Sequence, residues 1–430
     1  MEIRSSELGR QVGENVTVKG WLFNKRSSGP IAFFEIRDGF GWVSAVINKN
    51  DVSLTVWENA EKLTQESSLI VTGIVAKHPK KENVFELQVS DIQILQLAKD
   101  FPISKKEHGP DFLMDNRHLW LRSKSQWAIL RVRDAIITAI NGYLHDQGFI
   151  KVDSPIFTPN ACEGTTTLFA VPYFDLGTAY LSQSGQLYIE AAIASVGRCY
   201  DFGPVFRAEK SKTKRHLTEF WMMDAEAAFV EHDQNLQIQE GLVRHVIRHC
   251  LTNCAQELVI LERDVEKLKK ADAPFVRYTY DEAIQKLAEL GSDIKHGEDL
   301  GNDDEVLLTK NSDVPIFIEK WPKEIKPFYM KLDPANPNRA LNDDLIATEG
   351  AGELIGGSQR EEDVDVLIER MKHEGLNRAD YEWYLDLRRY GAVPHSGFGI
   401  GLERAVRWIT GVEHIRETIP FPRTISRLKP

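Results

Sequence analysis

The sequence has few cysteines and no long apolar run. Its four cysteines form no CxxC pair and stand at no histidine spacing suited to zinc, which favours reduced structural thiols. No apolar run approaches the roughly 20 residues that span a bilayer, and the N-terminal stretch MEIRSSELGRQ lacks the apolar core of a signal peptide. We therefore expect a cytoplasmic protein without a membrane partner.

Two common nucleotide-binding motifs are also missing. The GxGxxG spacing of a dinucleotide site and the Gly-Lys-Ser/Thr triplet of a phosphate loop are both absent. The net charge of −11 argues against a nonspecific nucleic-acid binder, although a local basic patch can still bind tRNA. The 430 residues, 42% apolar and 27% charged, suffice for two or three domains of an ordinary soluble protein.

The first quarter of the chain predicts a small β-barrel. A helical stretch near 57–63 interrupts five strand-like runs, at 16–23, 33–37, 43–47, 69–75 and 85–95. Five strands indicate an OB-type barrel over residues 1–97, whose strand face commonly binds single-stranded nucleic acid. Two prolines and a glycine mark 98–115 as a hinge. Residues 116–430 would form the second domain, with an inserted region at about 231–340.

The stretch 206–229, FRAEKSKTKRHLTEFWMMDAEAAF, carries the strongest chemical signal. Its second half alternates as a strand, and its first half concentrates six basic residues around the carboxylate of Glu209: Arg207, Lys210, Lys212, Lys214, Arg215 and His216. A basic loop between strands suits a polyphosphate, and Phe220 offers a ring on which a purine can stack. A solvated hairpin tip is the alternative interpretation.

Two glycine-rich stretches follow near the C-terminus. In GFGIGLER, 397–404, glycines at alternate positions let a ligand lie flat on a strand, and Arg404 begins the next helix at the ligand's edge. In LNDDLIATEGAGELIGGSQRE, 341–361, the carboxylates of Asp344 and Glu353 suit a hard cation. A close backbone crossing and a structural salt-bridge cluster are the respective alternatives.

A polar cluster at 161–192 has the character of a small-zwitterion site. Glu163 lies in a Gly- and Thr-rich loop, and the end of the following strand gathers four polar residues, Ser182, Gln183, Ser184 and Gln186. Such a loop opposite such a strand end can clamp a small zwitterion. An ordinary turn would look the same.

These stretches together resemble the class II aminoacyl-tRNA synthetases. Residues 206–209 resemble motif 2 of that class, 399–404 motif 3, and the helix and strand at 126–155 motif 1. The segments RHLTEFW, GGSQRE and YLDLRRYGAVPHSGFGIGLER resemble the archaeal-like asparaginyl-tRNA synthetases, a class IIb family, and the resemblance covers 20–430. It implies an α+β fold in which an OB-type anticodon-binding barrel precedes a class II catalytic domain, built on a mixed, mainly antiparallel sheet with flanking helices.

The resemblance implies an ATP-dependent asparagine–tRNA ligase. Such an enzyme activates L-asparagine with ATP and Mg²⁺, transfers it to the 3′ end of tRNA(Asn), and forms a homodimer through motif 1. Arg207, Glu209, His216 and Arg404 would be catalytic. The residues implied for ATP are Arg207, Glu209, Arg215, His216, Phe220, Glu353 and Arg404, with Asp344 and Glu353 as ligands of magnesium.

The resemblance also assigns residues to the amino acid and to the anticodon. Glu163 and Gln186 would take the ammonium group of the substrate. The full amino-acid set is Glu163, Ser184, Gln186, Glu190, Asp224 and Arg360. In the barrel, Phe33 would stack on the central anticodon base and Arg26 would hold its backbone, although Ser44 stands where these families usually carry a glutamine.

The choice of asparagine over aspartate rests on charge. Ile189 stands where aspartyl enzymes carry a lysine, and Glu190 follows it. A ligand carboxylate would be repelled by Glu190, whereas an amide can donate to Glu190 and accept from Arg360. Asp224 favours aspartate instead, because asparaginyl enzymes usually carry glutamate at this position. The alternatives are a nondiscriminating aspartyl-tRNA synthetase, a paralogue that makes free asparagine, and a tRNA-binding pseudo-enzyme.

Overall fold

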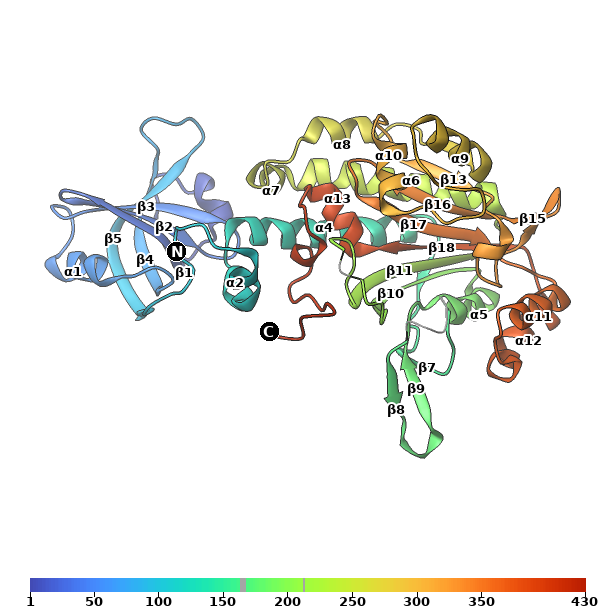
Figure 1. The fold of residues 1–430 in the computed structure, drawn as a ribbon. Helices are drawn as coiled ribbons and strands as arrows, with labels where there is room; N and C mark the ends of the chain where they lie inside the picture. Colours follow the sequence, from blue (N-terminus) through green and yellow to red (C-terminus); the bar gives the residue numbers. More distant parts are fainter. Residues whose placement is uncertain (163–167, 212) are drawn as a thin grey trace. The chain divides into compact units, whose positions relative to one another are not determined.

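The computed structural model describes residues 1–162, 168–211 and 213–430 (Figure 1). They form two compact units, Met1–Pro110 and Asp111–Pro430. Glu163 and Lys212, which the sequence placed at the site, lie outside the described residues. No described helix has the length and apolar content that crossing a membrane requires.

The N-terminal unit is a closed five-stranded barrel. Its strands follow the order β1-β2-β3-β5-β4, and all pairs are antiparallel except β3 with β5. Alternate residues such as Val16, Val18 and Leu22 on β1 are fully buried inside it, as the pleat of a strand requires. The predicted OB-type barrel is confirmed, with β1 (Asn15–Ser28), β2 (Ile31–Arg37), β3 (Trp42–Asn48), α1 (Leu54–Lys62), β4 (Ser68–Lys77) and β5 (Phe85–Gln96).

The C-terminal unit is built on an eight-stranded sheet in the order β12-β13-β16-β17-β18-β11-β10-β6. Only the two outermost pairs are parallel, so the predicted mixed, mainly antiparallel sheet is confirmed. Its strands are β6 (Ile150–Lys151), β10 (Arg198–Phe206), β11 (Glu219–Ala228), β12 (Val276–Thr279), β13 (Ile316–Glu319), β16 (Asn342–Ala347), β17 (Gly352–Gln359) and β18 (His395–Gly401).

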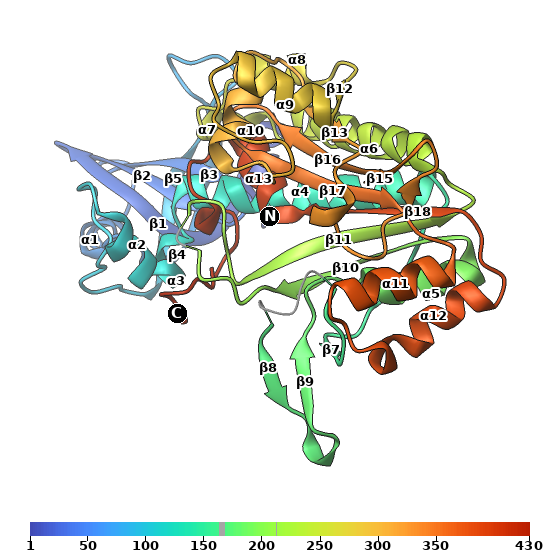
Figure 2. The same ribbon diagram turned by 45° about the vertical axis from the view of Figure 1, so that its right-hand side comes forward.

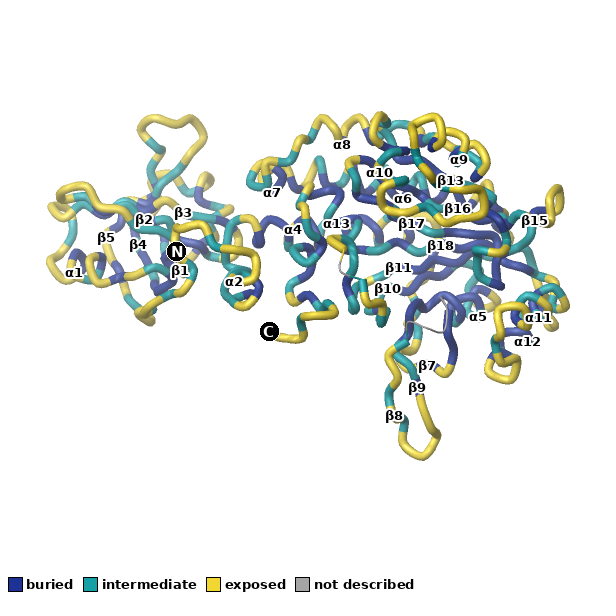
Figure 3. The backbone as a smooth tube through the Cα atoms, in the orientation of Figure 1, coloured by how far each residue is buried: buried dark blue, intermediate teal, exposed yellow. Residues whose placement is uncertain are grey.

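The helices that contribute most to the main core with the central strands are α4 (Lys124–Asp146), α6 (His232–Asn253) and α13 (Leu402–Thr410). Ser123 caps α4 by accepting a hydrogen bond from the backbone N–H of Gln126. The buried positions of α4, including Val132, Ile136 and Ile140, recur at helical spacing. Figure 3 shows the same burial as a dark band along the central strands.

The predicted inserted region consists of helices and the outer edge of the large sheet. After α6 it contains α7 (Ala255–Ile260), α8 (Val265–Ala271), α9 (Tyr280–Glu289), α10 (Asn302–Thr309), the edge strands β12 and β13, and the pair β14 (Leu332–Asp333) and β15 (Asn336–Ala340). Their cores are formed around Tyr280, Trp321 and Phe317. These elements bring polar side chains to the site described below.

A second group of elements lies on the opposite side of the sheet from α6. Figures 1 and 2 both show α5 (Gln186–Val196), α11 (Val364–His373) and α12 (Glu382–Arg389) there, with a small hairpin that projects away from the sheet. The hairpin strands are β8 (Ala170–Pro172) and β9 (Thr178–Leu181), and β7 (Phe157–Thr158) pairs with β9 to complete a three-stranded sheet. The short helices α2 (Pro110–Asp115) and α3 (Arg117–Trp120) precede α4.

Candidate active site

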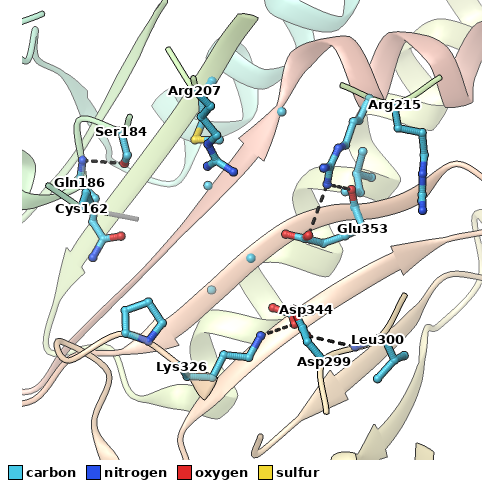
Figure 4. Close-up of a pocket in the computed structure, with 18 of the residues that line it drawn as sticks. Cys162, Ser184, Gln186, Arg207, Arg215, Asp299, Leu300, Lys326, Asp344 and Glu353 are labelled. Carbon is cyan, nitrogen blue, oxygen red and sulfur yellow. Dashed lines mark hydrogen bonds and ion pairs between the residues drawn. The ribbon is translucent and has the colours of Figure 1, made fainter. Parts of the chain in front are cut away.

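A cavity of about 830 Å³ in the C-terminal unit gathers most of the residues predicted from the sequence (Figure 4). Those that line it are Ser184, Gln186, Arg207, Glu209, Arg215, His216, Phe220, Asp224, Asp344, Glu353, Arg360 and Arg404. Glu190 does not line it. In Figure 4, Ser184 and Gln186 lie at one end and Arg215 and Glu353 at the other, with Arg207 between them.

Glycines on β18 make room for charged side chains in the cavity floor. A Cβ atom on Gly399 would lie 2.4 Å from Oδ1 of Asp224. A Cβ atom on Gly397 would lie 1.9 Å from Oε2 of Glu226 and 2.6 Å from Nη2 of Arg360. Because these contacts are closer than any real Cβ atom tolerates, only glycine allows the carboxylates and the guanidinium to reach the floor.

One end of the cavity is lined by arginines with few protein partners. Arg207 follows β10, with its guanidinium carbon 5.5 Å from the centre of the Phe220 ring. Its Nε has no hydrogen-bond partner among the described residues. Arg404, at the start of α13, donates from Nη1 to the backbone oxygen of Glu353 at 2.7 Å. Both guanidinium groups can therefore accept an anionic ligand without breaking a buried ion pair.

His216 lies at the same end, with Nε2 3.5 Å from Oε2 of Glu209. Burial, and after it the positive charge of Arg404, lower the pKa of His216, although Glu209 opposes the shift. The ring is therefore neutral at neutral pH. A neutral ring can either donate or accept a hydrogen bond at a bound nucleotide.

Two side chains from the inserted region line this end, although the sequence gave no signal for them. Nη1 of Arg215 lies 2.6 Å from Oε2 of Glu305 on α10. Burial raises the pKa of Glu305 and Arg215 opposes that shift. Lys326 donates from Nζ to Oδ2 of Asp344 at 2.7 Å and lies 4.0 Å from the centre of the Trp321 ring.

The carboxylates of Asp344 and Glu353 face one point on the cavity wall. A Cβ atom on Gly356 would lie 3.3 Å from Oε1 of Glu353 and 3.8 Å from Oδ1 of Asp344. Burial, opposed by Lys326, raises the pKa of Asp344 to about 7. Two carboxylates that face one point fit Mg²⁺, an ion that in proteins usually takes its other ligands from phosphates and water. The described residues contain no cluster of three or more metal-ligating side chains.

The opposite end is built around a buried ion pair. Arg360 donates from Nη2 to Oε2 of Glu226 at 2.9 Å and from Nε to Oε1 at 3.1 Å. Its Nη1 donates to Oγ of Ser358 at 2.6 Å. Sequence analysis did not single out Glu226, but strand alternation on β11 places it on the same face as Asp224. That signal was available in the sequence.

Glu190 lies behind this pair. Its carboxylate accepts from Nη2 of Arg388 at 2.7 Å, from the Tyr384 hydroxyl at 2.8 Å and from Nε2 of Gln186 at 3.2 Å. Burial alone would raise the pKa of Glu190, but Arg388 and then His395 hold it well below its ordinary value. Glu190 is therefore a fully paired anion that holds Gln186, rather than a free acceptor at the cavity surface.

Ile189 differs from its expected setting. It is 1% exposed and packs with Ile193 and Cys199 in a small core cluster, away from the cavity lining. Ile189 is therefore a core residue of α5, and a charge at this position would not face the ligand directly. The difference between an amide and a carboxylate has to be read from Glu226 and Arg360 instead.

Asp224 and Ser184 form a polar corner at the N-terminus of α5. Oδ2 of Asp224 accepts from Oγ of Ser184 at 2.8 Å and from the backbone N–H of Gly185 at 3.0 Å. Oγ of Ser184 also accepts from the backbone N–H of Gln186 at 3.0 Å. The corner combines an anion with oriented polar groups, which suits an ammonium ligand.

The two predicted anticodon residues face each other on the barrel. Arg26 on β1 is the cross-strand partner of Phe33 on β2, and its guanidinium carbon lies 4.8 Å from the centre of the Phe33 ring. Phe34 is 2% exposed and points inward. Because neighbouring side chains alternate, Phe33 lies on the outer face together with Arg26. Ser44 is the partner of Glu35 on the adjacent strand.

Comparison with known proteins matches both units. The family described as tRNA synthetases class II (D, K and N) matches residues 109–425, and the OB-fold nucleic acid binding domain matches 16–95. The chain belongs to the class II tRNA synthetases.

Individual relatives identify the branch of this family that the chain resembles. The asparagine–tRNA ligase of Roseiflexus sp. (strain RS-1) is 51% identical over 99% of this chain and 98% of its own. The asparaginyl-tRNA synthetase of Pyrococcus horikoshii complexed with asparaginyl-adenylate has a TM-score of 0.96 and 43% identity over the whole of both chains. That of Entamoeba histolytica, also with asparaginyl-adenylate, has a TM-score of 0.91 and 32% identity over 100% and 99%. Within its class, the chain belongs to the asparagine–tRNA ligases.

Proposed function

We propose that the cavity catalyses both steps of asparagine–tRNA ligation, with the amino acid at the Arg360–Glu226 end and ATP at the Arg207–Arg404 end. The proposal rests on one cavity that has, at one end, a partly exposed Arg404 and the guanidinium of Arg207, whose Nε has no partner among the described residues, and a buried ion pair at the other. The first end suits phosphates, and the second offers both a donor and an acceptor to an amide.

In the first step the asparagine carboxylate attacks the α-phosphorus of ATP. A carboxylate–phosphorus bond forms, the bond to the bridging oxygen breaks, and pyrophosphate leaves. No general base is needed because the nucleophile is already ionised, so catalysis consists of positioning and charge stabilisation. Arg207 bridges the carboxylate and the α-phosphate, and Arg404 holds the γ-phosphate. Glu209 and His216 orient the adenine and a phosphate, with Phe220 under the purine.

Mg²⁺ would be held by Asp344 and Glu353. When bound, the ion neutralises charge on the leaving pyrophosphate. Lys326 and Arg215 are the further cations of this end, and each is held in the free enzyme by a carboxylate, Asp344 or Glu305. A nucleotide and its metal can exchange partners with these ion pairs without leaving a buried charge unpaired.

The side-chain amide of asparagine has a donor and an acceptor at its end. We place its NH₂ against Glu226 and its oxygen against Arg360, with Glu190 fixing Gln186 from behind. A carboxylate ligand would bring a third anion beside Glu226 and Glu190 and leave a buried acceptor without a donor. The ammonium group would lie at Ser184, Gln186 and Asp224, with Glu163 as the further residue that the family resemblance implies.

In the second step the 3′-terminal hydroxyl of tRNA(Asn) attacks the activated carbonyl and AMP leaves. The barrel would read the anticodon through Phe33 and Arg26. The resemblance of residues 126–155 to motif 1 supports a homodimer, and charging of tRNA for translation supports a cytoplasmic location. Light scattering at micromolar concentration tests the dimer: a monomeric mass contradicts it.

Transfer of labelled asparagine to tRNA(Asn) tests the function as a whole. We expect asparagine-dependent release of pyrophosphate and acid-stable labelling of tRNA(Asn), but not of tRNA(Asp). Labelling of both tRNAs with aspartate would favour a nondiscriminating aspartyl enzyme. Activation without any labelling of tRNA would favour the paralogue that makes free asparagine.

A further inference from the structure

Asp201 lies beneath the amino-acid end of the cavity, and neither step described above uses it. It is on β10, directly opposite Asp224 on β11. Both residues are buried, with 8% and 5% of their surface exposed. Directly opposite side chains on neighbouring strands lie on the same face of the sheet, and like charges in that position repel each other.

The two carboxylates hold one turn from two sides. A Cβ atom on Gly185 would lie 1.7 Å from Oδ2 of Asp201 and 2.7 Å from Oγ of Ser154. Asp201 is therefore packed directly against the backbone of Gly185, whose N–H donates to Asp224. Asp224 lines the cavity and Asp201 does not. A change of charge on Asp201 would act on a ligand through this turn and through Asp224.

Among the described residues, the titratable and charged groups that interact with Asp201 are Asp224 from β11, Lys151 from β6 and the Cys199 thiol two residues away on β10. The N-terminal backbone of α5 lies above them. Burial, followed by the charge of Asp224, raises the pKa of Asp201 to about 7, while Ser154, the backbone of Asp224 and Lys151 oppose the shift. Two such carboxylates titrate as a unit, and a positive ligand beside them favours release of the shared proton.

We propose that Asp201 is a positioning residue whose proton is coupled to binding of the substrate's ammonium group. The inference rests on the proposed ammonium site at Ser184, Gln186 and Asp224. In the free enzyme below about pH 7, Asp201 keeps the proton and the pair carries one negative charge. When the ammonium binds at Asp224, the proton passes from the Asp201 carboxyl to solvent and the pair carries two.

This coupling predicts a pH dependence of asparagine affinity with a definite sign. A ligand that favours the ionised pair binds more tightly as the pH rises through the titration of Asp201. At saturating ATP, we expect the asparagine KM in pyrophosphate exchange to fall about three- to tenfold from about pH 6 to about pH 8. The kcat should change less than KM over the same range, because Asp201 does not touch the reacting atoms.

Asp201→Asn imitates the protonated acid and gives the decisive comparison. We expect its asparagine KM to be flat over the same pH range and to lie near the low-pH value of the unmodified enzyme. The matched control is Asp153→Asn, which removes an exposed carboxylate beside Lys151 and should keep the unmodified pH dependence. An unchanged slope in Asp201→Asn, or a flat profile in the unmodified enzyme, would overturn the proposal.

Calorimetry supplies a test that needs no variant. Asparagine binding to the unmodified enzyme near neutral pH, measured in two buffers of different ionisation enthalpy, should release a fraction of a proton, and the absence of release contradicts the coupling. Failure of the proposed ammonium site itself would look different. It would appear as an asparagine KM unaffected by Ser184→Ala and Asp224→Asn at any pH.

Discussion

The two ends of the cavity differ in how completely the protein satisfies its own charges. At the amino-acid end, the side chains of Arg360, Glu226 and Glu190 are 3%, 0% and 0% exposed and are bonded to one another or to neighbouring residues. At the ATP end, the side chains of Arg404 and Glu353 are 29% and 41% exposed and share one longer contact of 3.3 Å. The ion pair of Arg360 is thus complete without a ligand. The pair of Arg404 and Glu353 leaves both side chains open to one, although Arg215 and Lys326 nearby are held by closer pairs with Glu305 and Asp344.

The difference follows from what each end has to recognise. An amide and a carboxylate are nearly the same size, so discrimination requires buried groups that only one of them can satisfy. Such groups need a rigid frame that holds them in the absence of substrate. Phosphates carry enough charge to bind partly exposed guanidinium groups directly. A buried frame of charged groups is therefore less necessary around Arg404 at the ATP end.

The largest effect should come from breaking the frame at the amino-acid end. Arg388→Met leaves Glu190 buried without its closest cation, and we expect the free energy of unfolding to fall by about 3–5 kcal/mol. Urea denaturation followed by circular dichroism measures it. Arg389→Met, on an exposed neighbour that contacts Glu382 and Asp386, should change it by less than about 1 kcal/mol. Equal losses in the two variants would contradict the comparison.

The same variant has a pH signature. In the unmodified protein the pKa of Glu190 is lower in the folded state than in the unfolded state. The ionised Glu190 therefore stabilises the fold at pH values above the ordinary glutamate pKa, and this contribution is lost only as the pH falls through the pKa of the folded state. Without Arg388 the pKa of Glu190 rises, so protonation relieves the buried charge. The deficit of Arg388→Met relative to the unmodified protein should therefore be smaller at about pH 5 than at pH 7. A deficit that grows on acidification would contradict this account.

At the ATP end we expect loss of rate with little loss of stability. Arg207→Ala should remove about 3 kcal/mol of transition-state stabilisation, and Arg404→Ala a similar amount, because each loses a charged donor at a phosphate. That corresponds to about a 100-fold or larger fall in kcat/KM for pyrophosphate exchange. Arg378→Ala, on an exposed residue far along the chain, is the control. Near-normal exchange by Arg207→Ala would remove the arginine from the mechanism.

We expect the smallest effect from a substitution in the barrel, which should weaken tRNA binding without changing the chemistry in the cavity. Phe33→Ala should cost about 1–3 kcal/mol of tRNA(Asn) binding, as lost base stacking does. Asparagine activation without tRNA should not change. Phe40→Ala is a matched control, because Phe40 is an exposed aromatic of the same unit and, like Phe33, has a guanidinium over its ring, that of Arg4. Equal tRNA affinities for the two variants would exclude stacking at Phe33.

The fold could be predicted largely from the sequence because its signals are local. Strand alternation in the barrel, the helical spacing of α4 and the alternate glycines of β18 each lie within one element. Arg207, Arg404, Asp344 and Glu353, which the family resemblance picked out within short motifs, all line the cavity. Glu226 was also accessible, because it alternates with Asp224 on one strand.

The remainder of the site depends on contacts between distant segments. Arg388 meets Glu190 across 198 residues of sequence and Arg360 meets Glu226 across 134. No local pattern specifies such pairs. Lys326 and Glu305 come from the inserted region, where composition and periodicity indicated packing and surface only. Whether Ile189 and Glu190 face the cavity or the core likewise depends on the elements against which α5 packs. The hydrophobic periodicity of α5 alone does not identify those elements.

We propose that the amino-acid end of the cavity selects an amide over a carboxylate. The most direct measurement is ATP–pyrophosphate exchange with asparagine and with aspartate, side by side in the same enzyme preparation. Because an aspartate carboxylate would lie against Glu226 with no donor for it, we expect kcat/KM to favour asparagine by at least about 100-fold. Equal rates, or rates that favour aspartate, would contradict the account.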